Sequence, residues 1–527
     1  MELSRRDLLK LGFFGSAALM LPAERIARTQ LAIADRLPAS RLPQPFTVPF
    51  AVPPVATPVA RTVDTDLYSI AQVEAPVEIL PGIKTPIWGY NGITPGPTIV
   101  VPQGRKTLVR QLCNLPAVHP TLRYNVWSST HLHGSASLPE YDGYASDVTN
   151  PGEYKDYQYP NFQNARTLWY HDHGVHITAP NAYMGLAAMY ILHDQHELAL
   201  PIPHGIYDVP LIVKDAMFTS SGELIFDDNG GTGGGSGMFG DVILVNGRPW
   251  PAMPVQRRKY RFRLLNASVS RSYKWSLDSG EPMTVIATDG GFMPYPQPVS
   301  SFRQGMAERY EIVIDFAKYP AGRRVVLLNS SPPNNINYAN TNKVMAFDVV
   351  GDDFDPTDNA VPAALNPGNP VMALVESQAV QKRRIDLVRK DGNWTINGHT
   401  WDDVVRSKFS LTEADPKNGD VEVWEIRNSS GGWFHPVHIH LIDFKVLDRN
   451  GKPPMPHELG PKDVVYVGEN EVVRVLARFE GRGKYMIHCH NLVHEDHDMM
   501  SQFEVRDDGE DDPLGDPCKT LPEQDDV

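Results

Sequence analysis

Apolar positions in this chain fall into short runs, rich in β-branched residues and separated by Pro and Gly. Examples are "YRFRLLN" (260–266), "AERYEIVIDF" (307–316) and "VEVWEIRN" (421–428). Runs of this length and composition are typical of β-strands bounded by turns. The 46 Pro and 41 Gly in 527 residues also favour loops between short strands over long helices. The pattern therefore predicts an all-β protein built of sandwich domains.

The same order of signals occurs three times. Asn-Gly pairs begin at Asn91, Asn246 and Asn397, 155 and then 151 residues apart. Each pair is followed by a strand-like run that ends in Asn, and each unit closes with another strand-like run. Such self-similarity indicates repeated structural units. We predict three related domains at 65–195, 205–352 and 385–506, followed by an acidic tail at 507–527.

The N-terminus has the features of an export signal. Arg5 and Arg6 in "SRRDLLK" precede an apolar run from Leu11 to Ala23, which is too short to span a bilayer comfortably. This arrangement resembles a twin-arginine signal peptide, and Ala32 to Ala34 offers an Ala-x-Ala cleavage site. We expect residues 1–34 to be removed and the mature protein to be periplasmic or secreted, with no membrane association after signal removal.

Net charge limits the kinds of partner, and the number of cysteines limits the disulfides that can form. The formal net charge is −14, which argues against nucleic acid or an anionic membrane as partner. In an oxidising compartment, three cysteines allow at most one disulfide. Because Cys489 lies among histidines, we predict a disulfide between Cys113 and Cys518.

The histidines are clustered in the first and third units. Residues 205–352 contain none of the 18 His. Residues i and i+2 of a strand face the same side, so each His-x-His pair can direct two imidazoles into one cavity. Eight imidazoles from two units are enough for three copper ions, with positions left for oxygen, in a cluster held between the units. The four pairs are His131/His133, His171/His173, His438/His440 and His488/His490.

The segment "KYMIHCHNLVHEDHDMM" (484–500) adds a second kind of metal site. Two imidazoles, a thiolate and a weak axial Met form the blue-copper arrangement. Cys489, His494 and the more distant His435 supply the strong ligands, and spacing favours Met499 over Met500 as the axial one. Cys489 points away from its two neighbouring histidines, so the backbone of "HCH" can connect the two sites electronically.

The whole pattern resembles the three-domain multicopper oxidases. The segments "WYHDHGVHITAPNAY", "GGWFHPVHIHLIDFKV" and "HCHNLVHEDHDMM" look most like bilirubin oxidases, with bacterial spore-coat laccases next. The likeness covers most of residues 65–505. It implies three consecutive cupredoxin-like Greek-key β-sandwich domains and four copper ions.

The resemblance also implies the division of ligands. Type 1 copper would be held by His435, Cys489, His494 and Met499, and type 2 copper by His131 and His438. One type 3 copper would be held by His133, His171 and His490, and the other by His173, His440 and His488.

Several neighbouring residues match further positions of the family. Trp433 matches a Trp that shapes the type 1 site, although a packed aromatic is an equal alternative. Asp142 and Glu495 match acids near the oxygen site, where reduction of oxygen to water consumes protons; solvated or purely structural acids are the alternative. His176 and His497 lie off the ligand spacing and are expected to be surface or hydrogen-bonded histidines.

The predicted function is oxidation of a small-molecule donor coupled to reduction of O2 to water. The donor would be a phenol, an aromatic amine or a bilirubin-like tetrapyrrole. The alternative is a metal oxidase acting on Mn(II), Cu(I) or Fe(II), although no Met-rich insert of the copper-resistance type is present. A copper-free structural protein on the same scaffold is a remote alternative, because every ligand position is filled. The donor, the redox potential and the oligomeric state are left open by these patterns.

Overall fold

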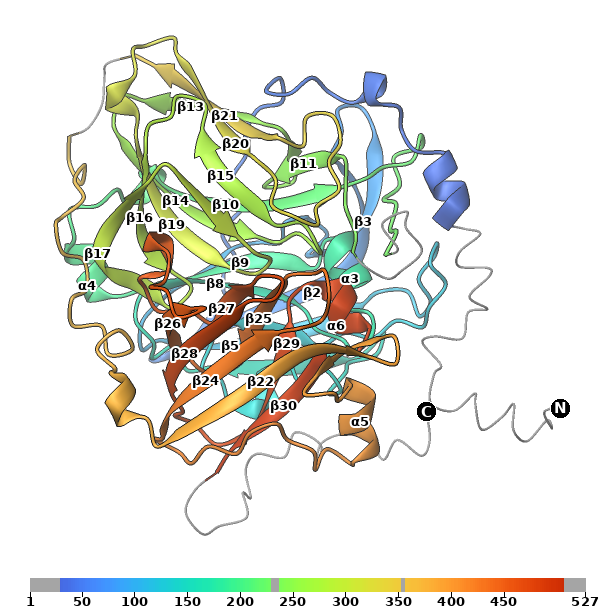
Figure 1. Cartoon of the computed structure of the whole chain (residues 1–527). Helices are drawn as coiled ribbons and strands as arrows, with labels where there is room; N and C mark the ends of the chain where they lie inside the picture. The colour runs from blue at the N-terminus through green and yellow to red at the C-terminus, as the bar shows by residue number, and fades with distance from the viewer. Residues whose placement is uncertain (1–28, 229–236, 352–355, 507–527) are drawn as a thin grey trace, which may run out of the picture.

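Three β-sandwiches follow one another along the chain (Figure 1). The computed structural model describes residues 29–228, 237–351 and 356–506. The twin-arginine segment up to residue 28, the acidic tail and Cys518 lie outside the described residues. Cys113 is buried, and its disulfide with Cys518 stays a prediction.

The first sandwich packs two sheets around one apolar core. In one sheet the order is β1-β2-β5-β7, with β3 paired to β2, and in the other it is β4-β9-β8-β6. The strands are β1 (Ala60–Arg61), β2 (Thr65–Glu78), β3 (Lys84–Tyr90), β4 (Ile99–Pro102), β5 (Lys106–Asn114), β6 (Thr130–His133), β7 (Tyr154–Tyr159), β8 (Arg166–Asp172) and β9 (Ala187–His193).

The second sandwich is the largest and has its own core. Its sheets have the orders β12-β11-β10-β14-β19-β16-β17 and β13-β21-β20-β15-β18. The strands are β10 (Asp208–Ala216), β11 (Val242–Val245), β12 (Arg248–Pro249), β13 (Ala252–Gln256), β14 (Lys259–Asn266), β15 (Tyr273–Leu277), β16 (Met283–Thr288), β17 (Gly291–Val299), β18 (Ser301–Gln304), β19 (Arg309–Asp315), β20 (Arg324–Asn329) and β21 (Lys343–Val350).

The third sandwich repeats the plan of the first. Its sheets have the orders β23-β22-β24-β28-β26 and β27-β25-β29-β30. The strands are β22 (Gln381–Lys390), β23 (Asn393–Ile396), β24 (Val421–Asn428), β25 (His435–Ile439), β26 (Phe444–Arg449), β27 (Val464–Val467), β28 (Val472–Arg478), β29 (Gly483–Cys489) and β30 (Met500–Val505). The predicted all-β fold of three sandwiches is confirmed.

The Asn-Gly pairs have the same structural role in each sandwich. Asn91, Asn246 and Asn397 adopt positive φ angles of 55°, 50° and 52°. Their side-chain oxygens accept hydrogen bonds from the amides of Ala71 on β2, Ile212 on β10 and Asp386 on β22, at 2.9, 2.8 and 2.7 Å. Asn tolerates this left-handed conformation better than most residues, which explains why it recurs. Each turn is thereby fixed by a hydrogen bond to the first long strand of its sandwich.

Parallel pairing places equivalent strands side by side in all three units. β2 pairs with β5, β10 with β14, and β22 with β24, each in parallel register. Parallel neighbours need a crossover connection rather than a hairpin. The strands with His-x-His residues, β6, β8, β25 and β29, come later in the chain and lie in the second sheet of sandwiches one and three.

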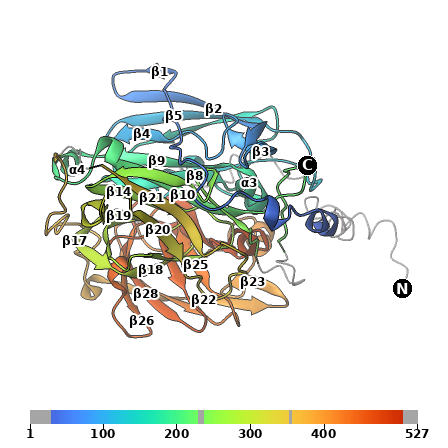
Figure 2. The same cartoon turned by 90° about the horizontal axis from the view of Figure 1, so that it is seen from above.

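The sandwiches pack against one another rather than lying in a row (Figures 1 and 2). α3 (Thr178–Met184) of the first sandwich lies beside α6 (Leu492–Asp496) of the third. The amides of Thr178 and Ala179 donate to the Asp496 carboxylate at 2.9 and 2.8 Å. Two other short helices are α4 (Gln195–Ala199), after the first sandwich, and α5 (Trp401–Arg406), in the third.

A buried charge network joins the first two sandwiches. The Arg263 guanidinium on β14 donates to Glu311, Glu197 and Asp208 and to the hydroxyl of Thr167 on β8, at 2.7–3.1 Å. Charge-assisted hydrogen bonds of this kind satisfy a guanidinium that would otherwise be costly to bury.

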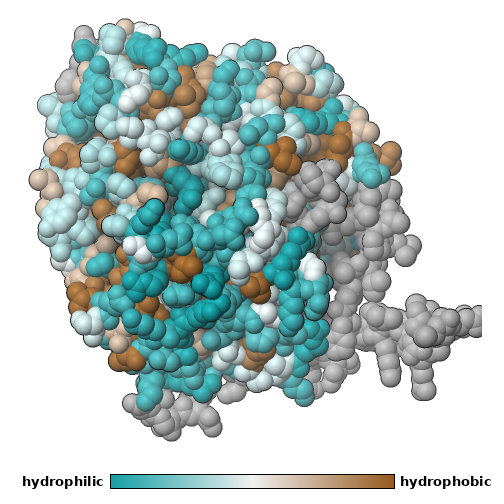
Figure 3. Space-filling model, in the orientation of Figure 1, coloured by the Kyte–Doolittle hydropathy of each residue, from teal (hydrophilic) through white to brown (hydrophobic). Residues whose placement is uncertain are grey.

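The face shown in Figure 3 is mostly hydrophilic, with apolar residues in small separate groups. Within the described ranges, no helix is both long and apolar enough to cross a membrane.

The contact of His176 with α5 has a pH dependence that can be tested. Partial desolvation would lower the pKa of the exposed His176, but Asp402 and Asp498, 3.6 and 3.9 Å away, outweigh it and raise the pKa to about 9. A raised pKa stabilises the fold below the ordinary His value, and this stabilisation is lost as the pH rises through about 9.

We therefore expect His176→Gln to lower the free energy of unfolding by about 0.2–1 kcal/mol in mildly acidic buffer, as for other partly exposed ion pairs. The difference from the wild type should vanish above the raised pKa. Urea unfolding of both proteins across this pH range measures it, and a difference that does not change with pH would contradict the assignment.

Candidate metal centres

The four His-x-His pairs lie on, or at the ends of, two pairs of adjacent strands. In the first sandwich, β6 and β8 place His131 opposite His171 in antiparallel register. In the third, β25 and β29 place His438 opposite His488. All eight imidazoles are buried at the contact between these sandwiches. They are called the eight-histidine cluster below: His131, His133, His171, His173, His438, His440, His488 and His490.

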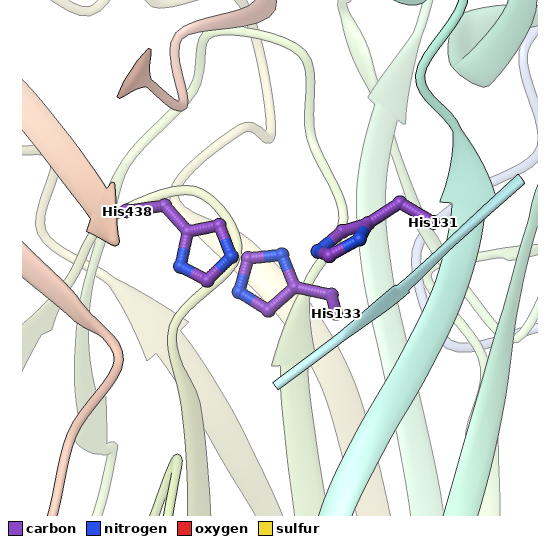
Figure 4. A group of neighbouring side chains, drawn as sticks. All are labelled: His131, His133 and His438. Atoms are coloured by element: carbon purple, nitrogen blue, oxygen red, sulfur yellow. The ribbon is translucent and has the colours of Figure 1, made fainter. Parts of the chain in front are cut away.

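Within this cluster the imidazoles form three groups whose nitrogens lie within 4.8 Å of one another. Figure 4 shows the first group, in which His131 and His133 from one strand face His438 from another. Each group combines residues of both sandwiches, so the metal-binding geometry exists only when the two are in contact. The groups are His131/His133/His438, His133/His171/His490 and His173/His440/His488.

Several ring nitrogens of the cluster are buried without a hydrogen-bond partner among the described residues. They are Nε2 of His131, His171 and His438, Nδ1 of His133 and His173, and both nitrogens of His490. Burial, together with the neighbouring imidazoles, lowers the pKa of His171 to about 3 and that of His173 to about 4. The rings of His171 and His173 are therefore neutral, and each has a lone pair available to a metal ion.

The opposite nitrogens of the same rings are held in place. Nδ1 of His438 lies 2.8 Å from the main-chain oxygen of Asp463, and Nδ1 of His171 lies 2.8 Å from that of Asp172. Nδ1 of His131 is similarly bonded to the main-chain oxygen of Asp142. A donor bond at one nitrogen fixes the tautomer and turns the other nitrogen toward the shared space, as metal-ligating histidines require.

A second buried group contains His435, Cys489 and His494. The Cys489 sulfur lies 3.3 Å from Nδ1 of His435 and 3.8 Å from Nδ1 of His494, and these two nitrogens are 3.2 Å apart. Burial raises the pKa of the Cys489 thiol well above its ordinary range. A thiolate at this position needs a compensating cation, and two imidazoles with one thiolate are a donor set that suits copper.

Met499 lies next to this group. Its amide donates to the main-chain oxygen of His494 at 2.9 Å, and its own main-chain oxygen accepts from the Cys489 amide at 3.0 Å. Its side chain is buried in the same core as Cys489. Met500 packs instead into a different apolar cluster, with Trp401. Of the two methionines, Met499 is therefore the one placed to approach the Cys489 sulfur.

Two tryptophans line the His435/Cys489/His494 group. The half-buried Trp433 meets the His494 ring edge-on, with ring centroids 5.3 Å apart. Trp394 stacks on the same ring at 4.3 Å and also lies 5.2 Å from the His435 ring. Trp394 is not evident from sequence because no fixed spacing links it to the ligand motifs.

Polar neighbours hold the outer nitrogens of the two imidazoles. The Ser430 hydroxyl lies 2.8 Å from Nε2 of His435, and Nδ2 of Asn491 lies 3.1 Å from Nε2 of His494. Neither residue was singled out from the sequence. Asn491 directly follows the "HCH" triplet, which is the one sequence signal that could have drawn attention to it.

Both predicted acids contact the eight-histidine cluster and are buried. An Asp142 carboxylate oxygen lies 2.7 Å from Nδ1 of His440. Burial raises the pKa of Asp142 well above its ordinary value. The Glu495 carboxylate lies 2.9 Å from Nδ1 of His488 and 3.5 Å from Nδ1 of His173. Burial would raise the pKa of Glu495, but His488 and His173 outweigh it and lower that pKa to about 2.

The histidines with other spacing lie outside these groups. His176 and His497 are exposed, and His176 contacts Asp402 and Asp498. Their surface position agrees with the expectation from the sequence that both are surface or hydrogen-bonded histidines.

Comparison with known proteins identifies the family. Three family models, each described as multicopper oxidase, match residues 73–197, 211–347 and 375–509. Each match corresponds to one β-sandwich.

Known relatives are similar over most of the chain. Bilirubin oxidase of Albifimbria verrucaria is 43% identical over 433 residues, covering 79% of this chain and 72% of that protein. A laccase of Bacillus subtilis is 34% identical over 478 residues, covering 80% and 91%. The crystal structure of a laccase from Pediococcus acidilactici superposes with a TM-score of 0.77 at 27% identity, covering 89% of this chain and 95% of that one. The chain therefore belongs to the multicopper oxidase family.

Proposed function

We propose that this enzyme couples one-electron oxidation of an organic donor to four-electron reduction of O2 to water. The donor class is phenols, aromatic amines or tetrapyrroles of the bilirubin type. The observation that carries the proposal is the "HCH" triplet: Cys489 belongs to the His435/Cys489/His494 group, while His488 and His490 belong to the eight-histidine cluster. The end of one strand thus connects a donor group that contains Cys489 to a donor group made of imidazoles.

Four copper ions would occupy these positions. We assign His435, Cys489, His494 and Met499 to type 1 copper, and His131 and His438 to type 2. His133, His171 and His490 are assigned to one type 3 copper, and His173, His440 and His488 to the other. Bound copper would supply the one-electron redox chemistry at both sites.

The protein's own residues would orient the ligands and handle protons. Ser430 and Asn491 hold the outer nitrogens of His435 and His494, which fixes the directions of the rings. Reduction of O2 to water consumes four protons, so carboxyl groups are needed beside the oxygen site. Asp142 and Glu495 are assigned this role because each touches a cluster imidazole.

We further propose that the donor approaches past Trp433. His435, Cys489 and His494 are fully buried, whereas Trp433 is partly exposed and touches the His494 ring. An aromatic side chain at the mouth of the site suits a planar aromatic donor. Export by the twin-arginine pathway to the periplasm or outside the cell also remains a proposal.

The donor class is tested by oxygen uptake of the copper-loaded enzyme. We expect both bilirubin and dimethoxyphenol to be oxidised. The ratio of their kcat/KM values shows which of the two donors the enzyme prefers. Activity on neither compound, with activity on Mn(II) instead, would replace the organic donor by a metal ion.

Cys489→Ser should abolish the intense blue absorption and the oxidase activity, because a hydroxyl cannot replace the thiolate. Visible absorption and oxygen uptake measure both effects. Retained blue colour in the variant would contradict the type 1 assignment.

Met499→Leu should raise the type 1 redox potential, because a weak axial ligand that stabilises the oxidised site is removed. Met500→Leu is the matched control and should leave the potential unchanged. Redox titration of the blue absorption compares the two variants. If Met499→Leu has the wild-type potential, Met499 is not the axial ligand.

Asp142→Asn should lower kcat by about 10²–10⁴-fold, the usual contribution of a positioned proton-transfer group. Copper content and blue absorption should remain at the wild-type level. Steady-state oxygen uptake measures the change, and a wild-type kcat would exclude Asp142 from proton delivery.

A further inference from the structure

The second sandwich holds a buried arginine beside the eight-histidine cluster. Arg309, at the start of β19, has no exposed surface, and its guanidinium N–H groups bond to acceptors from all three sandwiches. Nε donates to the main-chain oxygen of Thr167 at 3.0 Å in the first sandwich. Nη1 and Nη2 donate at 3.2 Å to the main-chain oxygens of Ala307 and Asp289 in the second. Both also donate to the Asp463 carboxylate in the third.

Asp463 in turn contacts two cluster histidines from different sandwiches. Its carboxylate oxygen Oδ1 lies 3.2 Å from Nε2 of His133, and its main-chain oxygen lies 2.8 Å from Nδ1 of His438. The two imidazoles stack with centroids 3.7 Å apart. Their other nitrogens, Nδ1 of His133 and Nε2 of His438, are the ones without a partner. Asp463 thus directs one ligand from each side toward the shared space.

The second sandwich also holds the backbone around Asp463. A carboxylate oxygen of Asp289, in the turn between β16 and β17, accepts from the amides of Asp463 and Val464, both at 3.2 Å. It also pairs with the Lys462 ammonium at 2.9 Å. Asp463 is therefore fixed through its main chain as well as its carboxylate.

The neighbouring chain leaves room for this contact. Gly134 directly follows the ligand His133, with φ of +87°. A Cβ there would lie 2.6 Å from Nη2 of Arg309 and 2.6 Å from Oδ2 of Asp463. Only a residue without a side chain lets the buried ion pair come this close to the ligand strand.

A buried ion pair is weak evidence for stability, because desolvation offsets most of the attraction. The pair matters here because Asp463 contacts the imidazoles of His133 and His438. We propose that Arg309 and Asp463 are positioning residues that hold His133 and His438 for copper, so that the second sandwich is part of the metal site. The inference rests on the proposed function, in which these histidines bind copper of the cluster.

Arg309→Lys tests the proposal, since a lysine keeps the charge but cannot make the forked contact with Asp463. Arg263→Lys is the matched control: Arg263 is equally buried and also reaches β8, but none of its hydrogen bonds goes to a cluster histidine or to Asp463. Both variants are loaded with copper and titrated with a chelator. Copper per protein, the type 2 electron paramagnetic resonance signal and the blue absorption are then followed together.

We expect Arg309→Lys to bind cluster copper about 10–100-fold more weakly, the usual effect of losing a group that orients a metal ligand. Its type 2 signal should change while its blue absorption per protein stays at the wild-type level. Arg263→Lys should lose thermal stability but keep the wild-type cluster signals. Equal retention of cluster copper in the two variants would overturn the proposal.

Asp463→Asn is the second variant, used if Arg309→Lys does not fold. It keeps the size of the side chain and the main-chain contact to His438, and should show the same selective loss at the cluster. Wild-type copper affinity and an unchanged type 2 signal in this variant would overturn the proposal. A wild-type protein that holds no copper among the eight histidines would instead contradict the proposed function, and this inference with it.

Discussion

The structure depends on eight buried imidazoles that face one another across the contact between the first and third sandwiches. Leaving a buried polar nitrogen without a hydrogen bond costs about 1–3 kcal/mol. Several such nitrogens lie together here, so this interface is poorly satisfied by protein groups alone. Metal ions remove that cost because each takes up several lone pairs at once. Copper binding at the proposed site would therefore be coupled to the docking of the two sandwiches, as in other sites where metal affinity contributes to folding.

The three sandwiches share structural features but differ in the chemical groups that they carry. All three sandwiches share the Asn-Gly turn and the parallel pairing of equivalent strands. The first and third carry imidazoles on the strands that meet, and the third adds a thiolate at the end of β29. The second has no histidine, yet its Arg309 and Asp289 contact Asp463 of the third sandwich, and Arg309 also contacts Thr167 of the first. The second sandwich thus separates the other two along the chain and also contributes charged hydrogen bonds to their contact.

Local patterns were enough to predict the fold and most of the side chains that lie together in the candidate site. Alternation along a strand pairs His131 with His133, and fixed offsets from Cys489 lead to His494 and Met499. These signals are visible because the residues that act together are close in sequence or recur in the same unit. The family resemblance then supplied the division of the imidazoles among the copper types.

Residues that act through long-range contacts could not be found in this way. Asp463 lies 330 positions from His133, and an aspartate before an apolar run has no distinctive pattern. Trp394 reaches the His494 ring from a hairpin about 100 residues earlier, and its position depends on how β23 packs. Each residue is recognised only in the folded structure, because tertiary packing decides which residues of different elements come into contact.

We expect the two buried donor groups to hold four copper ions in one protein. Crystals of the copper-loaded enzyme, measured on both sides of the copper absorption edge, test this most directly. One anomalous peak is expected between His435, Cys489 and His494, and three peaks are expected within the eight-histidine cluster. A loaded crystal with a peak at the cysteine alone, or with copper bound only at surface histidines, would contradict this expectation.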